Sequence, residues 1–314
     1  MENTVKTLIP QVQWYPGHMK KAKDIIVNNL KLVDVVIELL DARIPYSSAN
    51  PMLQEIIAGK PRLVALNKSD LADMKVTKEW VAYFRQQGIP AVAVDAPQGR
   101  GIKQLVSMTE ALAKPMTDKL VSKGAKPRAA RVMILGIPNV GKSSLINRLA
   151  GSNKAKTADR PGVTRAKQWI RLGGNLELLD TPGILWPKFE DMTAGLKLAF
   201  TGAINDEAID RELITGVFLQ TMADMYPDRL RERYKLAGDL PSEPHELLEL
   251  IGRKRGCLMK GGIVDTEKAQ RIVMTDFRGG KLGTVSLDMP PKLDAAAQAD
   301  AAAQGDVPEE KGGA

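Results

Sequence analysis

Short apolar runs alternate with amphipathic stretches in the N-terminal part of the chain. The runs have the length and continuity of buried strands, and the segments between them place apolar residues at helical spacing. Strands that alternate with helices predict an α/β fold with a mainly parallel sheet, whose ligand loops follow the carboxyl ends of the strands. We expect strands at 33–40, 62–66, 91–94 and 132–135, a hairpin of 168–172 and 176–179, and helices at 20–32, 50–58, 77–87, 102–114 and 144–149.

The pattern changes after Trp186, where helical periodicity takes over. Helices are expected at 208–226, 246–251 and 265–277, and Asp265 is placed to cap the last of these. This part therefore predicts a second, mainly helical domain. The expected division is a tail at 1–13, an α/β domain at 14–190 with a flexible linker at 115–130, a helical domain at 191–290 and a disordered tail at 291–314.

Composition narrows the class of protein. The chain has 314 residues with a formal net charge of +8, which favours an anionic partner, although solubility alone could account for the excess. One cysteine and two histidines exclude a disulfide framework and a polyhistidine metal centre. No apolar run is long enough to span a membrane and the N-terminus lacks a signal-peptide core, so we expect a cytoplasmic protein without a membrane partner.

The segment from Gly136 to Ser144, GIPNVGKSS, has the spacing of a phosphate-binding P-loop between a strand and a helix. Glycines let successive backbone amides face a phosphate, and the following helix N-terminus adds partial positive charge. Lys142 is expected to reach the β- and γ-phosphates and the Ser143 hydroxyl to bind Mg²⁺. The nucleotide-binding residues expected here are Asn139, Val140, Gly141, Lys142, Ser143 and Ser144.

Further short motifs belong with this loop. Asp180-Thr181-Pro182-Gly183 follows a strand, so Asp180 is a candidate Mg²⁺ ligand and the amide of Gly183 a candidate γ-phosphate contact. Thr164, in a polar loop, could close on Mg²⁺ when a third phosphate is present.

The base is expected to be read by Asn67-Lys68-Ser69-Asp70. The Asp70 carboxylate can accept two hydrogen bonds from guanine, whereas adenine offers no such donor pair. Lys68 is expected along the base plane, and Asn67 is expected to tie this loop to the P-loop. These residues predict binding of GTP and GDP rather than ATP.

The order of the motifs is unusual, because the base-reading loop precedes the P-loop in the chain. Such connectivity can close into one domain if the original termini lay close together at the surface. We therefore expect a circularly permuted P-loop GTPase domain, in which the loop at 180–183 leads almost directly into the helical domain.

Together with Trp14 to Met19 and Asp41-Ala42-Arg43, these motifs make the chain similar to the circularly permuted GTPases of the ribosome biogenesis GTPase A family over roughly residues 14–290. The resemblance implies a bacterial GTPase that acts late in assembly of the large ribosomal subunit and is stimulated by that particle. It also implies contact between the helical domain and ribosomal RNA, and we expect a monomer away from the ribosome. One departure is the base-backing loop, where this chain has Asp95-Ala96 instead of a serine-containing pair.

The catalytic group is less evident from the motifs. Ile184 occupies the position where many G proteins place a water-orienting glutamine, so slow intrinsic turnover is expected, with Lys142 and Thr164 contributing to catalysis. The resemblance implies that His18 acts in hydrolysis, and the alternative is that it caps a turn. It likewise implies that Asn139 holds a stimulatory K⁺, and the alternative is that Asn139 shapes the P-loop.

Two basic clusters are candidates for RNA phosphate contacts, with a solvated surface as the alternative. They are Arg253-Lys254-Arg255 with Lys260, and Arg229, Arg231, Arg233 and Lys235. Two other functions stay open: a P-loop GTPase that drives RNA modification or another metabolic reaction, and an RNA-binding scaffold with a vestigial nucleotide site.

Overall fold

The computed structural model describes residues 16–151, 169–172, 175–179 and 191–291. A six-stranded sheet in the order β3-β2-β1-β4-β6-β5 forms the centre of its larger part. All neighbouring strands are parallel except β5, which pairs with β6 as the expected antiparallel hairpin. The strands are β1 (Val35–Asp41), β2 (Arg62–Asn67), β3 (Ala91–Ala93), β4 (Ala130–Gly136), β5 (Trp169–Leu172) and β6 (Leu176–Leu179).

The strand order shows how the rearranged chain closes into one sheet. β4, which leads into the P-loop, pairs with β1, and β1 pairs with β2, which leads into the base-reading loop. Leu39 lies beside Gly136, while Asp41 lies beside Asn67. The two loops therefore leave the same edge of the sheet, as the motif order predicted for a circularly permuted P-loop fold.

Helices cover both faces of the sheet. On one face, α2 (Pro16–Leu30) and α4 (Pro51–Ile57) pack against β1 and β4, while Trp80 and Phe84 of α5 (Met74–Gln86) pack against β1 and β2. On the other face lie α6 (Ile102–Ser122) and α7 (Lys142–Leu149). A short helix, α3 (Pro45–Ser48), follows β1 and was not expected from the sequence.

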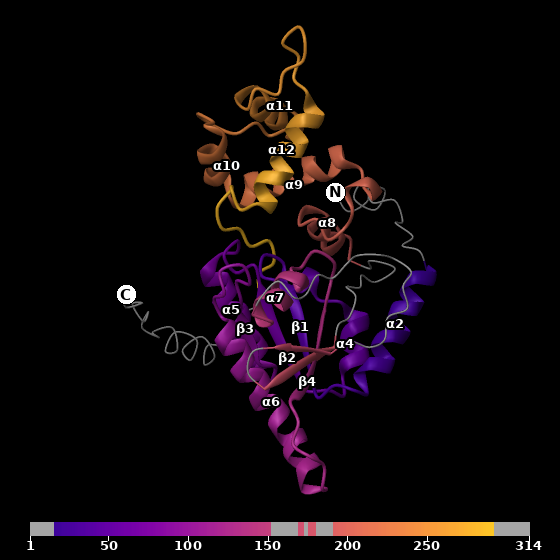
Figure 1. Cartoon of the computed structure of the whole chain (residues 1–314). Helices are drawn as coiled ribbons and strands as arrows, with labels where there is room; N and C mark the ends of the chain where they lie inside the picture. Colours follow the sequence, from indigo (N-terminus) through magenta and orange to yellow (C-terminus); the bar gives the residue numbers. More distant parts are fainter. Residues whose placement is uncertain (1–15, 152–168, 173–174, 180–190, 292–314) are drawn as a thin grey trace.

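The first half of the flexible linker expected at 115–130 is helix. α6 continues through Pro115 to Ser122, and β4 begins at Ala130, which leaves a short exposed turn between them. Proline removes the hydrogen bond to the carbonyl four residues earlier, at Ala111. Both Ala111 and Pro115 are exposed, so water can satisfy that carbonyl and the helix survives. In Figure 1, α6 projects from the sheet at the end opposite the helical region.

The helical region begins with α8 (Met192–Phe200) and continues with α9 (Arg211–Met225), α10 (Pro227–Tyr234), α11 (Pro244–Lys254) and α12 (Thr266–Arg278). The last three helices expected from periodicity correspond to α9, α11 and α12, whereas α8 and α10 were not expected. Asp265 caps α12 as predicted, because its carboxylate accepts a hydrogen bond from the Lys268 amide at 2.9 Å.

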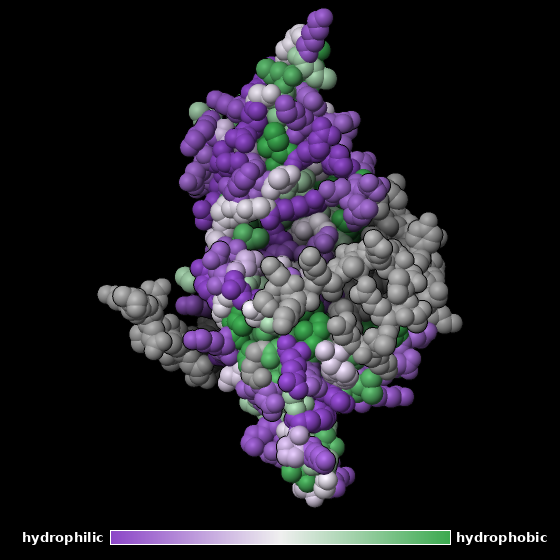
Figure 2. Space-filling model, in the orientation of Figure 1, coloured by the Kyte–Doolittle hydropathy of each residue, from purple (hydrophilic) through white to green (hydrophobic). Residues whose placement is uncertain are grey.

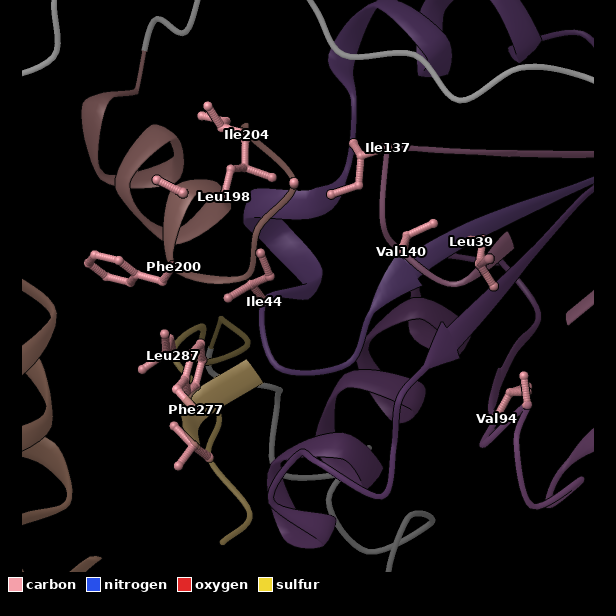
Figure 3. Packing of buried hydrophobic residues seen from close by; sticks show 14 of the residues in the cluster. Leu39, Ile44, Val94, Ile137, Val140, Leu198, Phe200, Ile204, Phe277 and Leu287 are labelled. Atoms are coloured by element: carbon pink, nitrogen blue, oxygen red, sulfur yellow. The ribbon is translucent and has the colours of Figure 1, made fainter. Parts of the chain in front are cut away.

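One hydrophobic core connects the sheet to the helical region. Figure 3 shows Ile44 and Ile137 beside the sheet, with Leu198, Phe200 and Ile204 of the helical region facing them. Phe277 and Leu287 also belong to this cluster. Because the cluster is continuous, the helical region cannot swing away from the sheet without exposing apolar surface.

Residues 282–288, which we call the closing segment, return from α12 to the sheet edge. The amides of Val285 and Leu287 donate to the carbonyls of Leu71 and Arg43, at 2.9 and 2.8 Å. The buried Asp288 carboxylate accepts hydrogen bonds from Ser47 and from Lys197 of α8. The closing segment therefore holds the sheet, α3 and the helical region together.

Candidate nucleotide-binding site

The P-loop connects β4 to α7 and has a backbone that depends on glycine. Gly141 has a left-handed conformation with φ of 98°, and a Cβ there would lie 2.3 Å from Nδ2 of Asn67. A Cβ at Gly136 would lie 2.6 Å from the Leu39 carbonyl oxygen. Side chains at either position would separate the P-loop from its neighbours, so both glycines are needed for the loop to sit against the sheet.

The base-reading loop is joined to the P-loop by its first residue. Nδ2 of Asn67 donates to the Val140 carbonyl at 2.8 Å, and its Oδ1 accepts from the Ala96 amide at 3.3 Å. The expected tie between Asn67 and the P-loop is therefore present. One buried side chain fixes the P-loop, the base-reading loop and the loop at 95–96 relative to each other.

Lys68 makes a second tie that the sequence did not predict. Its Nζ donates to the Asn139 carbonyl at 2.7 Å and to the Asp41 carboxylate at 3.0 Å. Burial lowers the pKa of Lys68, and the adjacent Asp41 carboxylate opposes that shift. Because Asn139 and Val140 both turn their carbonyls toward the base-reading loop, the P-loop is held from that side. Asp70 is exposed at the end of the loop.

Asp41 and Arg43 form a buried ion pair behind this arrangement. Nε and NH2 of Arg43 donate to the two Asp41 oxygens at 2.9 and 2.7 Å, and each residue is 1% exposed. Burial alone would raise the pKa of Asp41, but the Arg43 and Lys68 charges hold it well below its ordinary value. Sequence reasoning assigned no role to this pair, although two opposite charges directly after a buried strand were a usable signal.

In the base-backing loop, Asp95 stands where a serine-containing pair was expected, and its carboxylate has partners within the loop. The buried Asp95 carboxylate accepts from NH2 of Arg100 at 2.6 Å and from the Gln98 amide at 3.1 Å, so it stabilises its own loop. Arg148 of α7 donates to the Ala96 carbonyl at 2.9 Å. The helix that follows the P-loop thus also holds the loop expected behind the base.

Comparisons with known proteins agree with this geometry. The family described as "50S ribosome-binding GTPase" matches residues 131–219. A Bacillus cereus protein named "Ribosome biogenesis GTPase A" is 53% identical over 282 residues, which cover 90% of this chain and 95% of that protein. A Bos taurus protein named "Mitochondrial ribosome-associated GTPase 1" is 31% identical over 301 residues, 88% of each chain.

The chain belongs to the ribosome biogenesis GTPase A family. A solved structure described as GNP-bound YlqF from T. maritima resembles it with a TM-score of 0.59 and 30% identity, covering 87% of this chain and 100% of that one. The fold is accordingly a circularly permuted P-loop GTPase domain with a helical region after it.

Several residues that the sequence analysis singled out lie outside the described part of the chain. These are Thr164, Asp180, Gly183 and Ile184. His18 lies in the first turn of α2, which begins at Pro16 rather than after the expected turn, and its side chain is not described. Ser143 and Ser144 are exposed in the first turn of α7, where a phosphate-bound cation would need a hydroxyl ligand.

Asn139 connects the P-loop to the helical region. Its Nδ2 donates to the Gly202 carbonyl at 2.7 Å, and its backbone has a left-handed φ of 56°. This contact supports the alternative in which Asn139 shapes the loop. A cation would bind the side-chain oxygen rather than the nitrogen, so the two roles are compatible.

The second basic cluster is partly used inside the protein. Arg233 donates to both oxygens of the buried Asp276 at 2.9 and 3.0 Å, and Arg231 pairs with Asp228 at 2.9 Å. These two arginines are therefore poorer candidates for RNA contact than the sequence suggested. The remaining members are exposed, namely Arg229 and Lys235 here and Arg253, Lys254, Arg255 and Lys260 in the first cluster. Figure 2 shows the face of the helical region that it presents as mostly hydrophilic.

Within the described ranges, no helix combines the length and apolarity needed to cross a bilayer. The same ranges contain no group of three or more His, Cys, Asp or Glu side chains placed to hold a metal ion.

Proposed function

We propose that this chain binds and hydrolyses GTP with Mg²⁺ and acts late in assembly of the large ribosomal subunit. In this proposal the GTP-bound protein docks on ribosomal RNA and leaves after hydrolysis. The observation that carries it is the pair of hydrogen bonds by which Asn67 and Lys68 hold the carbonyls of Val140 and Asn139. They bring a guanine-reading loop and a phosphate loop together although the chain order is reversed.

The residues present fit a guanine nucleotide with its cation. The left-handed backbone of Gly141 lets the P-loop lie directly against Asn67, and Ser143 stands at the N-terminus of α7. Mg²⁺, when bound, supplies positive charge to the phosphate oxygens. Ser143, Thr164 and Asp180 are the side chains we assign to it, and Lys142 is assigned to the β- and γ-phosphates.

The ribosomal partner is inferred from relatives. Proteins of this family carry the name "Ribosome biogenesis GTPase A", and the matching family is described as ribosome-binding. The exposed basic residues of the helical region provide charge for phosphate contacts in RNA.

Two assignments concern the rate of hydrolysis. His18 is proposed to orient or deprotonate the attacking water, because Ile184 cannot do so. Asn139 is proposed to hold K⁺ through its side-chain oxygen, which would add positive charge beside the phosphates.

The test compares nucleotide states and variants in sucrose gradients with large ribosomal subunits. The wild-type protein should sediment with subunits in a non-hydrolysable GTP analogue and stay at the top of the gradient in GDP. Lys142→Ala should lose triphosphate turnover and nucleotide-dependent sedimentation, with exposed Lys103→Gln as the matched control. Equal sedimentation in both nucleotides would refute the docking cycle, and wild-type turnover by Lys142→Ala would refute the P-loop assignment.

His18 needs a separate measurement. His18→Ala should retain GTP affinity and lose most of the hydrolysis stimulated by the subunit. Unchanged stimulated hydrolysis would return His18 to the role of capping the start of a helix.

A further inference from the structure

A basic cavity of ≈ 230 Å³ lies in the helical region, between α9 and α12. Arg211 and Thr215 line it from α9, Arg271, Thr275 and Arg278 line it from α12, and Asp206 lies at its edge. Ile209, Ile214 and Met274 complete the wall. None of these residues belongs to the nucleotide site or to the two basic clusters described above.

The charges in this cavity do not cancel. The guanidinium of Arg278 binds partners inside the protein. It donates to both Asp206 oxygens at 2.7 and 2.8 Å and to the carbonyls of Ala199 and Phe200. Arg271 has only a 3.7 Å contact with the exposed Glu267. Within the described ranges Arg211 has no salt bridge or side-chain hydrogen bond. The hydrogen bonds from Arg278 lower the pKa of the Asp206 carboxyl, and the charge of Arg211 helps to lower it. Two arginines therefore line the cavity without a close ion pair of their own, and its one lining carboxylate, Asp206, is already paired with Arg278.

A buried hydroxyl points to the same conclusion. Thr215 is 0% exposed, and its Oγ1 has no hydrogen-bond partner in the described part of the chain. A buried polar atom without a partner destabilises the folded state, so proteins rarely retain one without use. A ligand oxygen in the cavity would give this hydroxyl an acceptor.

We propose that this cavity binds a phosphate group, with Arg211 and Arg271 as its charged ligands and Thr215 as its hydroxyl donor. Guanidinium forks match the oxygens of a phosphate, and a hydroxyl donor adds a further hydrogen bond. The volume has room for a phosphate with part of its sugar. We assign the phosphate to an RNA backbone, and this source rests on the proposed function.

The cavity also lies close to the P-loop. A second cavity of ≈ 330 Å³ shares Asp206 and Arg278 with it and is lined by Pro138 and Asn139. Arg278, which lines both cavities, holds the carbonyls of Ala199 and Phe200, just before the Gly202 carbonyl that binds Asn139.

The first arm of the test uses inorganic phosphate and the full chain saturated with GDP and Mg²⁺, so that the P-loop is occupied. The ¹³C-methyl signal of Met274, which lines the cavity, should shift as phosphate is added, while that of Met222 in the core should not. Arg211→Gln with Arg271→Gln should abolish the shift. Thr215→Val should weaken phosphate binding without lowering thermal stability, because it removes a hydroxyl that has no partner. Lys268→Gln, an exposed charge on α12, is the matched control and should behave as wild type.

The second arm uses transcribed 23S ribosomal RNA in a salt titration. Each of Arg211→Gln and Arg271→Gln should weaken RNA binding by about tenfold and reduce the salt slope by about 1, with GTP hydrolysis unchanged. A phosphate shift without any change in RNA affinity would identify a site for a small free phosphate and overturn the RNA source. Absence of a Met274 shift in wild type, or a shift that survives in the double variant, would overturn the site itself. Failure of wild type to bind ribosomal subunits would instead count against the proposed function.

Discussion

Asn67 and Val140 are 73 positions apart in the chain, yet the side-chain amide of one holds the backbone carbonyl of the other at 2.8 Å. This bond crosses between the loop that follows β2 and the loop that follows β4. The bond therefore fixes the distance between the base pocket and the phosphate pocket. The chain itself does not fix this distance, because the order of the two motifs is reversed.

Removal of this bond should weaken the binding of GTP and of GDP to a similar extent. Asn67→Ala leaves the Val140 carbonyl and the Ala96 amide without partners, so affinity for both GTP and GDP should fall about tenfold or more. Isothermal titration calorimetry measures both affinities, with the exposed Asn28→Ala as control. A loss confined to GTP would contradict a role in spacing the two pockets.

Asp70 should decide which base is bound. Asp70→Asn replaces one acceptor by a donor, so guanine loses its paired contact while xanthine, with an acceptor in place of the guanine amino group, gains one. GTP affinity should fall at least about 100-fold and xanthosine triphosphate should become the better ligand. Competition against a fluorescent nucleotide measures the exchange. Retention of the GTP preference by this variant would show that another residue reads the base.

The Asp41–Arg43 pair should make stability depend on acid pH. The folded protein holds the pKa of Asp41 well below its value in the unfolded chain, so the unfolded state binds more protons below about pH 4. The stability that Asp41 contributes is therefore complete above that pH and is lost as the pH falls further. Asp41→Asn should lower the free energy of unfolding at pH 7 by about 3 kcal/mol, since it leaves Arg43 buried without its charge partner.

Urea unfolding between pH 7 and pH 3 tests this prediction. The variant should show a shallower loss of stability with acid than the wild type. The exposed Asp118, which pairs with Lys114 on α6, provides the control, and Asp118→Asn should leave the curve unchanged. Parallel curves for wild type and Asp41→Asn would contradict the assignment.

Substitutions of Arg233 and Arg253 should affect the free energy of unfolding differently, although the sequence made both residues candidates for RNA contact. Arg233→Ala leaves Lys281, at 3.4 Å, as the remaining salt-bridge partner of the buried Asp276 in the described ranges, so the free energy of unfolding should fall by about 3 kcal/mol. Arg253→Ala should leave stability within about 0.5 kcal/mol, because its contact with Glu249 is exposed. Differential scanning calorimetry compares the two, and equal melting temperatures would refute the distinction.

Asp288 should control how firmly the helical region is attached. Asp288→Ala removes the acceptor for Ser47 and for Lys197, at 2.6 and 2.7 Å, and leaves Lys197 near the core with no opposite charge at that point. Hydrogen exchange at the amides of Val285 and Leu287 should become at least about tenfold faster, which corresponds to about 1.4 kcal/mol of local stability. Unchanged exchange at these amides would show that the backbone bonds of the closing segment suffice.

The sequence predicted the parts of the fold whose signals are local. Strand runs such as 132–135, the glycines of the P-loop and the Asp265 cap each follow from neighbouring residues, and the structure has all of them. The hydrogen bond between Asn67 and the P-loop was also predicted, because the Asn67 to Asp70 motif assigns its first residue to this contact.

The parts that were missed depend on partners far away in the chain. α8 is buried over most of its length, so its sequence MTAGLKLAF lacks the polar face that reveals a helix. Nothing near Arg233 indicates Asp276, and nothing near Arg43 indicates Phe277, whose ring lies 5.0 Å from its guanidinium carbon. The sequence predicted that α6 ends just before Pro115, because proline usually stops a helix. The helix tolerates Pro115 because this position is exposed, and exposure is a property of the folded state.

The position of the closing segment has a consequence for biosynthesis. A ribosome translating this chain releases the base-reading half first, then the P-loop, and the residues that bind the Leu71 and Arg43 carbonyls only later. A nascent chain can therefore assemble its nucleotide pocket before those carbonyls have received their final partners. The contacts that fasten the helical region to that pocket are therefore the last that translation makes available.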